Sequence, residues 1–294
     1  MKKIRIQFTW LTSFYSPVIS VMTGGFLRAE GLEYEWTLCE PGTSGMNAVI
    51  EGSADIAQTT LTHAFAPINK GESYACRHFA QVNGMDGFFI VGKKADPDFS
   101  WNKLEGSKVV ALHGGQPMAM LRYACHRKGL DISKINFVNA GAGAKMLEAF
   151  LIDEVDYIHL QGPTSHQLEA DGKGYILDRE GPVVGPCAFS SLAARADWLQ
   201  SPEAAAFGRA YRNTLIYLRN SSAEDIARAQ WDLFRSIDLK VLTNCIKDYK
   251  ELGCWSLDPA ISLRGYERML DIFQHNKLID IRFPYDQICA PFPE

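Results

Sequence analysis

Six polar segments hold most of the residues whose types could bind a small ligand. They span residues 9–17, 40–45 and 58–63 in the first third of the chain, and 113–117, 139–143 and 161–166 in the middle. All six are rich in hydroxyls, amides and glycines and carry almost no charge. Glycine lets the backbone approach a ligand closely, and free amides at a helix start attract anions. The alternative is that these residues only cap helices.

Three aromatic residues in the first segment, Trp10, Phe14 and Tyr15, could form a wall for a flat or amphipathic ligand. Core packing is the alternative, and we expect at least one of the three to be core. With a stretch rich in Gly and Pro at residues 181–190, the six segments supply the candidate ligand-binding residues: Thr9, Trp10, Phe14, Tyr15, Thr43, Ser44, Thr59, Thr60, His63, Gly114, Gly115, Gln116, Gln161, Pro163 and Cys187.

His63 and Cys187 are the two candidates for catalysis. Histidine can act as an acid, a base or a neutral hydrogen-bond donor. His63 could therefore face a ligand, or it could be a structural hydrogen-bonding residue. A nucleophilic cysteine needs a neighbouring cation or a helix start, and the sequence shows no such partner for Cys187, so a buried inert thiol is the alternative.

The sequence predicts no metal and no cofactor. Its seven histidines show neither HxH nor HxxxH spacing, and its seven cysteines form no CxxC pair. No GxGxxG follows a strand, and the chain contains neither GxxxxGK[ST] nor GxSxG. The absence of these motifs gives less support to a protein that binds dinucleotides or nucleoside triphosphates, or that acts as an α/β-hydrolase.

The elements that must position these segments form a repeat. Apolar stretches predict strands at residues 4–9, 32–38, 54–57, 108–113, 135–139 and 155–160. Helical patterns at 45–51, 118–128 and 144–151 lie between them, and similar sequences (NAVIEGSAD and EAFLIDEVD) lead into the third strand of each copy. Alternating strands and helices predict parallel βαβ units. We therefore expect an α/β chain of two lobes, with the ligand in a cleft beyond the carboxyl ends of the strands.

The chain should cross between the lobes twice, near residues 92–101 and 181–190. Helical patterns follow at residues 202–218, 223–235, 239–252 and 263–275. The expected lobe I is residues 1–92 plus 188–294, and the expected lobe II is residues 93–187.

The amino-acid composition indicates which binding partners and which cellular compartment to expect. The 294 residues are 47% hydrophobic and 22% charged, with a net charge of −4, which gives no basic surface for nucleic acid or anionic membranes. The apolar stretches are too short for membrane insertion. An odd number of cysteines and a start (MKKIRIQFTW) without a signal-peptide pattern favour a cytoplasmic chain. The alternative is a periplasmic protein whose signal peptide has been removed.

Five segments give the chain a family resemblance. They are GGFLRAEGLEYEWTL, NAVIEGSADIAQTTLTHAFAPINKGE, GSKVVALHGGQPMAMLRYACHRKGLD, DWLQSPEAAAFGRAYRNTLIYL and GCWSLDPAISLRGYERMLDIFQ. In these segments the chain resembles the type 2 periplasmic-binding-protein superfamily, in its sulfonate/taurine-binding and thiamine-pyrimidine-synthase-like branch. The resemblance implies a ligand bound between two lobes, and for most members a partnership with an ABC permease.

The resemblance also leaves an enzyme open, such as a lyase or hydrolase of the desulfinase or decarboxylase kind on the same fold. In the pyrimidine synthase a histidine matching His63 is consumed as substrate, and a lysine four residues earlier holds pyridoxal phosphate. This chain has Thr59 at the lysine position, and only Cys187 where that enzyme has its cysteine cluster. Both departures argue against that reaction. We expect a solute-binding protein, with the enzyme as the alternative.

Overall fold

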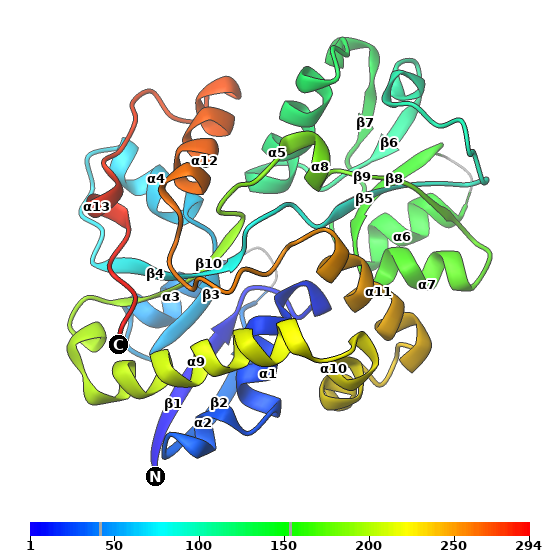
Figure 1. Cartoon of the computed structure of the whole chain (residues 1–294). Coiled ribbons are helices and arrows are strands. Elements are labelled where there is room, and N and C mark those ends of the chain that lie inside the picture. Colours follow the sequence, from blue (N-terminus) through cyan, green and yellow to red (C-terminus); the bar gives the residue numbers. More distant parts are fainter. Residues whose placement is uncertain (41–42, 153–154) are drawn as a thin grey trace.

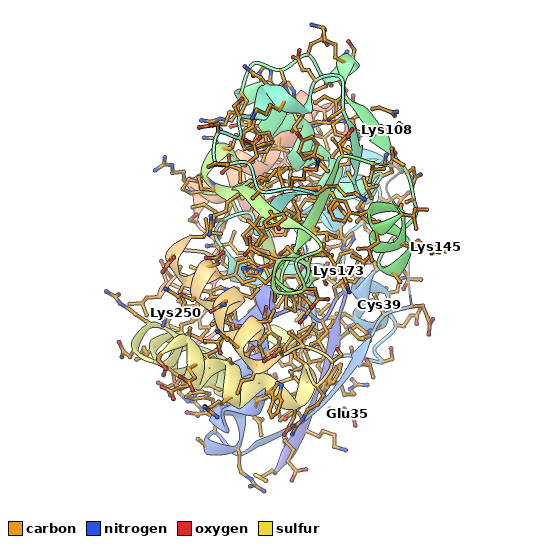
Figure 2. All side chains as sticks on the ribbon, turned by 90° about the vertical axis from the view of Figure 1, so that its right-hand side faces the viewer. Glu35, Cys39, Lys108, Lys145, Lys173 and Lys250 are labelled. Carbon is orange, nitrogen blue, oxygen red and sulfur yellow. The ribbon has the colours of Figure 1, made fainter. Side chains whose placement is uncertain are left out.

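The computed structural model describes residues 1–40, 43–152 and 155–294. The chain forms two five-stranded sheets, each flanked by helices, and they lie at the lower left and upper right of Figure 1. We call the first sheet with its helices lobe I and the second lobe II. Figure 2, seen from the side, shows lobe II with Lys108, Lys145 and Lys173 above lobe I with Cys39 and Glu35.

The sheet of lobe I has the strand order β2-β1-β3-β10-β4. Its strands are β1 (Lys2–Phe8), β2 (Leu32–Leu38), β3 (Ile56–Thr59), β4 (Cys76–Asn83) and β10 (Ser190–Arg195). β1 runs parallel to β2 and β3, whereas β10 is antiparallel to both of its neighbours. The expected parallel βαβ unit is therefore confirmed for β1, β2 and β3.

The sheet of lobe II repeats this plan with the order β7-β6-β8-β5-β9. Its strands are β5 (Phe88–Gly92), β6 (Lys108–Val110), β7 (Asn136–Val138), β8 (Tyr157–Gln161) and β9 (Tyr175–Arg179). β6 is parallel to β7 and β8, and β5 is antiparallel to β8 and β9. Each sheet thus combines four strands that run in the same direction with one antiparallel strand that enters it directly from the other lobe.

Helices cover both sheets and continue to the C-terminus. Those that follow strands of the two repeats are α1 (Ser16–Thr23), α2 (Phe26–Ala29), α3 (Gly45–Ile50), α4 (Thr62–Asn69), α5 (Gly115–Arg127), α6 (Ala144–Leu151), α7 (Thr164–Ala170) and α8 (Gly181–Val184). The later helices are α9 (Pro202–Asn220), α10 (Ala223–Gln230), α11 (Leu239–Glu251), α12 (Leu263–His275) and α13 (Tyr285–Ile288). Short 3-10 turns are η1 (Ser13–Tyr15), η2 (Trp101–Leu104), η3 (Ile132–Lys134), η4 (Trp198–Gln200) and η5 (Trp231–Leu233).

Local sequence explains where the long helices begin. α9 starts at Pro202, and the side chain of Ser201 accepts a hydrogen bond from the amide of Ala204 at 3.2 Å. Ser262 caps α12 in the same way through the amide of Gly265 at 3.0 Å. The helix expected at residues 223–235 is shorter than predicted, because α10 ends at Gln230 and a 3-10 turn follows.

Two sequence-based boundaries need correction. The third strand of lobe I was expected at residues 54–57, but β3 runs from Ile56 to Thr59. The expected lobe boundary at residue 92 placed β5 in lobe I, whereas β5 pairs with β8 and β9 in lobe II. An apolar run predicts a strand but does not reveal which sheet completes its hydrogen bonds. We therefore propose that the first crossing lies between β4 and β5.

The two crossings lie side by side. The amide of Cys187 donates to the carbonyl oxygen of Gly84 at 3.0 Å, and the amide of Phe189 donates to that of Asn83 at 3.0 Å. Two helices near the C-terminus also touch both lobes: α11 packs on α10 and α7, and α12 packs on α5. One cluster of buried apolar side chains runs through both lobes. No helix within the described ranges is long and apolar enough to cross a membrane.

Candidate functional site

Polar side chains from both lobes meet at the carboxyl ends of the parallel strands. Thr12, after β1, donates from Oγ1 to the carbonyl oxygen of Gly162, after β8, at 2.5 Å. Thr62, at the start of α4, donates to Oε1 of Gln116 in α5 at 3.4 Å. The loops that the sequence singled out in each lobe therefore make contacts between the lobes.

Tyr15 is the predicted aromatic residue whose polar group lies near both lobes. Its side chain is 6% exposed and lies near Gln58 in β3 and Gln161 in β8. Burial raises the pKa of the phenol and the two glutamines oppose the rise, so Tyr15 stays protonated. The Nε2 amide group of Gln58 is buried without a hydrogen-bond partner among the described residues. Gln58 was not among the predicted site residues, although it lies within one of the six segments.

His63 is held by two predicted hydroxyls. Its Nδ1 lies 2.5 Å from Oγ1 of Thr59 and 3.2 Å from Oγ of Ser44. Burial lowers the pKa of His63, so the imidazole is neutral at pH 7. In the described part of the chain the other ring nitrogen, Nε2, makes no hydrogen bond to protein. The arrangement leaves one ring nitrogen for a ligand, as donor or acceptor according to the tautomer.

Gln116 links three parts of the chain. Besides the contact with Thr62, its Nε2 donates to the carbonyl oxygen of Phe189 in the second crossing at 2.7 Å. The two glycines before it, Gly114 and Gly115, are exposed at the start of the 13-residue helix α5 and have φ of +82° and +62°. These conformations favour glycine, and they leave the first backbone amides of the helix open.

The other predicted residues have mixed surroundings. Phe14 is fully buried and its ring packs against Phe189 and Tyr249, so it is the expected core member of the aromatic group. Trp10 is 40% exposed. The remaining members are Thr9, which donates to the carbonyl oxygen of Gln58 at 2.9 Å; Thr43, which is exposed; Thr60, which bonds to Thr62 at 2.6 Å; and Pro163, which is buried. Residues 41–42 of the second segment lie outside the described residues.

The surroundings of Cys187 do not favour a nucleophile. It is 1% exposed, and its pKa is raised by burial and by the nearby carboxyl groups of Asp86 and Glu180. A thiol in such surroundings stays protonated. The structure thus supports the inert alternative for this residue.

A buried acidic cluster beside the crossings was not apparent from the sequence. Asp86 and Glu180 are fully buried, and Glu180 hydrogen-bonds to Nε2 of His159. Burial raises the pKa of both carboxyl groups, and for Asp86 the charge of Glu180 adds to this rise. Burial lowers the pKa of His159 to about 4. Burial therefore favours the uncharged form of all three side chains.

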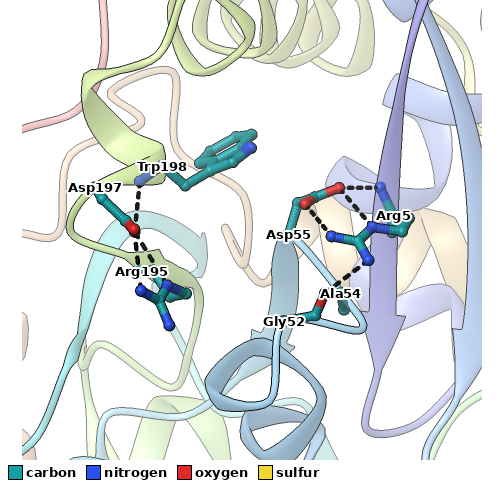
Figure 3. A pocket seen from close by; sticks show the side chains of 7 residues that line it. All are labelled: Arg5, Gly52, Ala54, Asp55, Arg195, Asp197 and Trp198. Carbon is teal, nitrogen blue, oxygen red and sulfur yellow. Dashed lines mark hydrogen bonds and ion pairs between the residues drawn. The ribbon is translucent and has the colours of Figure 1, made fainter.

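A surface pocket of about 340 Å³ lies at the opposite ends of the lobe I strands (Figure 3). Asp55, which precedes β3, holds Arg5 in an ion pair of 2.6 Å, and Arg195 pairs with Asp197 at 3.0 Å. Each charge in this pocket already has a partner, and none of the six segments lines it. Among the residues that the structure describes, no group of three or more His, Cys, Asp or Glu side chains could hold a metal ion.

Comparison with known proteins gives a consistent group of relatives. A model of the family described as NMT1/THI5 like matches residues 15–224. "Putative binding protein YtlA" of Bacillus subtilis (strain 168) is 25% identical over 292 residues, which cover 98% of this chain and 87% of that protein.

Solved structures show the same fold. The alkanesulfonate-binding protein SsuA of Xanthomonas axonopodis pv. citri, bound to MOPS, is 14% identical with a TM-score of 0.75, and the match covers 99% of each chain. The periplasmic aliphatic sulphonate binding protein SsuA of Escherichia coli is 15% identical with a TM-score of 0.74, covering 100% of this chain and 94% of that one. The expected periplasmic-binding-protein fold is therefore confirmed.

Proposed function

The chain belongs to the NMT1/THI5-like family, and from this premise we propose that it is a solute-binding protein of the ABC-importer kind that closes on a small organic ligand. The relatives named above are binding proteins, which favours solute binding over the enzyme alternative. The observation that carries the proposal is Tyr15, a buried residue of lobe I whose side chain lies near one glutamine from each lobe. A ligand that entered beside Tyr15 would contact both lobes at once.

The ligand would be bound chiefly by neutral groups. His63 offers Nε2, Gln58 offers an amide without a partner, and the backbone amides at Gly114 and Gly115 open from the start of α5. Helix-start amides favour an anionic group, and the exposed ring of Trp10 suits an aromatic one. These groups support a small organic ligand that is anionic or aromatic, with an ABC permease as the protein partner.

The enzyme alternative has less support from the same residues. The neutral imidazole of His63 could transfer a proton, but the second candidate, Cys187, is a buried thiol beside two carboxyl groups. The position of the cofactor lysine in the pyrimidine synthase is occupied by Thr59, whose hydroxyl bonds to His63. We therefore propose binding without chemistry.

The relatives, and not the cysteine content, are the basis on which we propose a cellular compartment. The sulphonate-binding relative of Escherichia coli is described as periplasmic, so the expected cytoplasmic location lacks support from the comparisons. The seven cysteines, all free thiols in the structure, had suggested the cytosol. We propose the periplasmic location.

A ligand screen followed by solution scattering tests the proposal. Thermal melts with a panel of alkanesulfonates, aromatic sulfonates and aminopyrimidines should reveal a compound that raises Tm, because a ligand that binds only the folded state stabilises it. Calorimetry should then give one site per chain. The radius of gyration should fall when that ligand saturates the protein, since hinge closure makes a two-lobed chain more compact. A compound that is turned over to product would support the enzyme instead.

A further inference from the structure

Two histidines face each other where a helix of lobe II meets a helix that packs on lobe I. α5 follows β6 in lobe II, and α12 packs on α4 of lobe I through Phe273 and Phe65, whose ring centroids lie 5.5 Å apart. α5 and α12 contact each other (Figure 1). The ring centroids of His126 in α5 and His275 in α12 are 4.3 Å apart, with 33° between the ring planes.

Two hydrogen bonds beside this pair fix the position of the helices. Nδ2 of Asn276 donates to the carbonyl oxygen of Ala119 at 2.9 Å, and Arg268 donates to the hydroxyl of Tyr123 at 2.9 Å. Ala119, Tyr123 and His126 are spaced by four and three residues, so they lie on one face of α5. The face of α5 that carries His126 is therefore the face that meets α12.

The imidazole nitrogens of the pair are available to a ligand. Both histidine side chains are exposed, and in the described part of the chain neither ring makes a hydrogen bond or an ion pair. Burial and the charge of His126 lower the pKa of His275, which favours the neutral imidazole that metal ions bind. His159 and His166, in contrast, are buried and each contacts a carboxyl group.

Both histidines lie at helix ends that attract a cation. His126 is in the last turn of α5, and His275 is the last residue of α12. The last carbonyl groups of a helix carry a partial negative charge, equivalent to about half an elementary charge. Two such ends at one point favour a positive ion between them. The nearby cation Arg268 opposes this, but its guanidinium is bonded to Tyr123.

The separation of the two rings suits a single metal ion. Imidazole nitrogens bind Zn²⁺ at about 2.0–2.1 Å, so two nitrogens on one ion lie about 3 Å apart. Rings whose centroids are 4.3 Å apart reach this separation by turning about their side-chain torsions, and exposed side chains are free to turn. Within the described ranges no third His, Cys, Asp or Glu side chain completes the group. Water would therefore fill the other positions on the ion.

We propose that His126 and His275 bind one divalent transition-metal ion and that this ion joins α5 of lobe II to α12. Imidazole is a ligand of Zn²⁺, Ni²⁺ and Cu²⁺, whereas Mg²⁺ and Ca²⁺ prefer oxygen ligands, so the site selects the first group.

The metal site is separate from the proposed solute site. His126 lies at the opposite end of α5 from Gly115, about 16 Å along the helix. Metal binding needs no solute, and solute binding needs no metal. Failure to find a solute and failure to bind metal are therefore distinguishable results.

Calorimetry with Ni²⁺ tests the site. The chain is prepared without a histidine tag, freed of metal with a chelator and titrated with nickel chloride at pH 8. Ni²⁺ is chosen because it binds imidazole and is less suited than Zn²⁺ to thiolate ligands. One ion should bind per chain. Absence of binding would overturn the proposal, and so would one ion shared by two chains, seen as a doubled molecular mass in light scattering.

Variants identify the ligands. His126→Asn and His275→Asn should each weaken Ni²⁺ binding roughly tenfold or more, because even a partner of a ligand contributes roughly 10–100-fold to metal affinity. The double variant should bind little worse than either single variant, since each already breaks the pair. Equal affinity in the unaltered chain and either single variant, or additive losses in the double variant, would contradict a shared ion. Circular dichroism verifies the fold of each variant.

His113→Asn is the matched control for these variants. His113 is also exposed, but among the described residues no histidine or aromatic ring packs beside it. The control should bind Ni²⁺ as tightly as the unaltered chain. A loss of affinity equal to that of His126→Asn would show that Ni²⁺ binds to exposed histidines in general, which would overturn the site.

Electron paramagnetic resonance tests the ligand set without any variant. The unaltered chain with one equivalent of Cu²⁺ should show coupling to two imidazole nitrogens. Coupling to only one imidazole nitrogen would overturn the site.

Thermal melts test the joining of the two helices. Ni²⁺ should raise the Tm of the unaltered chain and of His113→Asn but not of His126→Asn or His275→Asn, because an ion that requires both helices stabilises the folded arrangement in which they touch. Ni²⁺ that binds the unaltered chain and leaves its Tm unchanged would overturn the joining.

Discussion

Thr12 in lobe I donates a hydrogen bond of 2.5 Å to the carbonyl oxygen of Gly162 in lobe II. The amide of the same glycine donates to the hydroxyl of Tyr249 in α11 at 2.8 Å. One residue of lobe II is therefore bound by lobe I and by α11 together. The packing of the two lobes and α11 depends on how near the three elements can approach at this point.

Gly162→Ala should destabilise the closed chain by about 1–3 kcal/mol, the usual cost of an extra methyl group in a packed interior. The reason is the approach of 2.2 Å that its Cβ would make to Sγ of Cys245. Denaturant unfolding measures the effect. Because Cys245→Ala removes that sulfur, the double variant should lose less stability than the sum of the two single variants. Additive losses would show that the sulfur does not limit this contact.

Tyr15→Phe should weaken binding of the ligand found in the screen by about 1 kcal/mol, or roughly fivefold, because it removes the hydroxyl that lies near both Gln58 and Gln161. Titration calorimetry measures the loss. Tyr211→Phe is the matched control: this tyrosine is also buried, but its hydroxyl bonds to the carbonyl oxygen of Gln81 within lobe I at 3.0 Å. The control should lower Tm and leave the affinity unchanged. Equal loss of affinity in both variants would mean that the effect is general.

Asp86→Asn should flatten the dependence of stability on pH. Because burial raises the pKa of Asp86 in the folded chain, its contribution to stability is present below the unfolded pKa of about 4 and is lost as pH rises through the folded value. The variant should therefore gain more in Tm at pH 8 than at pH 5.

Asp258→Asn is the control for this pH dependence. Both aspartates accept a hydrogen bond from the amide two residues later, Asp86 at 2.6 Å and Asp258 at 3.0 Å, but Asp258 is exposed. Thermal melts across pH should show no such gain for the control. If the Tm of Asp86→Asn rises by the same amount at pH 5 and at pH 8, then Asp86 is not a neutral group in the folded chain.

Much of the fold was predictable because its signals are local. The repeat of strands and helices, the parallel order of β1, β2 and β3 and the cap of α9 all follow from short patterns. β10 was not predicted as a strand, and β5 was assigned to the wrong lobe. Both strands pair with strands far away in the sequence. The residues of a strand do not show which distant strand it will pair with.

The candidate site was predictable in part for the same reason. Ser44 caps α3, Thr59 ends β3 and His63 lies in the first turn of α4, so their types and close positions in the chain could indicate a shared site. The pairing of His126 with His275 joins two helices that are far apart in the sequence, and it depends on how α12 packs on α5. Neither residue alone differs from an ordinary helix residue, and the sequence could not reveal the pair.

Thiol titration of the native protein, denatured without reductant, should count close to seven free cysteines. All seven are free thiols in the structure, and six of them are buried, so reaction should be slow before denaturation. A count near five would indicate one disulfide and hence a fold that differs around the cysteines involved. The half-buried Cys39 should react first in the folded chain, as shown by peptide mapping.

His63→Ala should weaken ligand binding by about 1–3 kcal/mol with little change in Tm, because a donor or acceptor to the ligand is lost. The loss should be constant between pH 7 and pH 8, since burial lowers the pKa of His63 below its usual value. Calorimetry and thermal melts measure both quantities. His275→Ala, which removes an exposed histidine of α12, is the control and should change neither. If His63→Ala binds normally but melts many degrees lower, the bonds from Thr59 and Ser44 make His63 part of the scaffold, and the ligand must bind elsewhere in the closed chain.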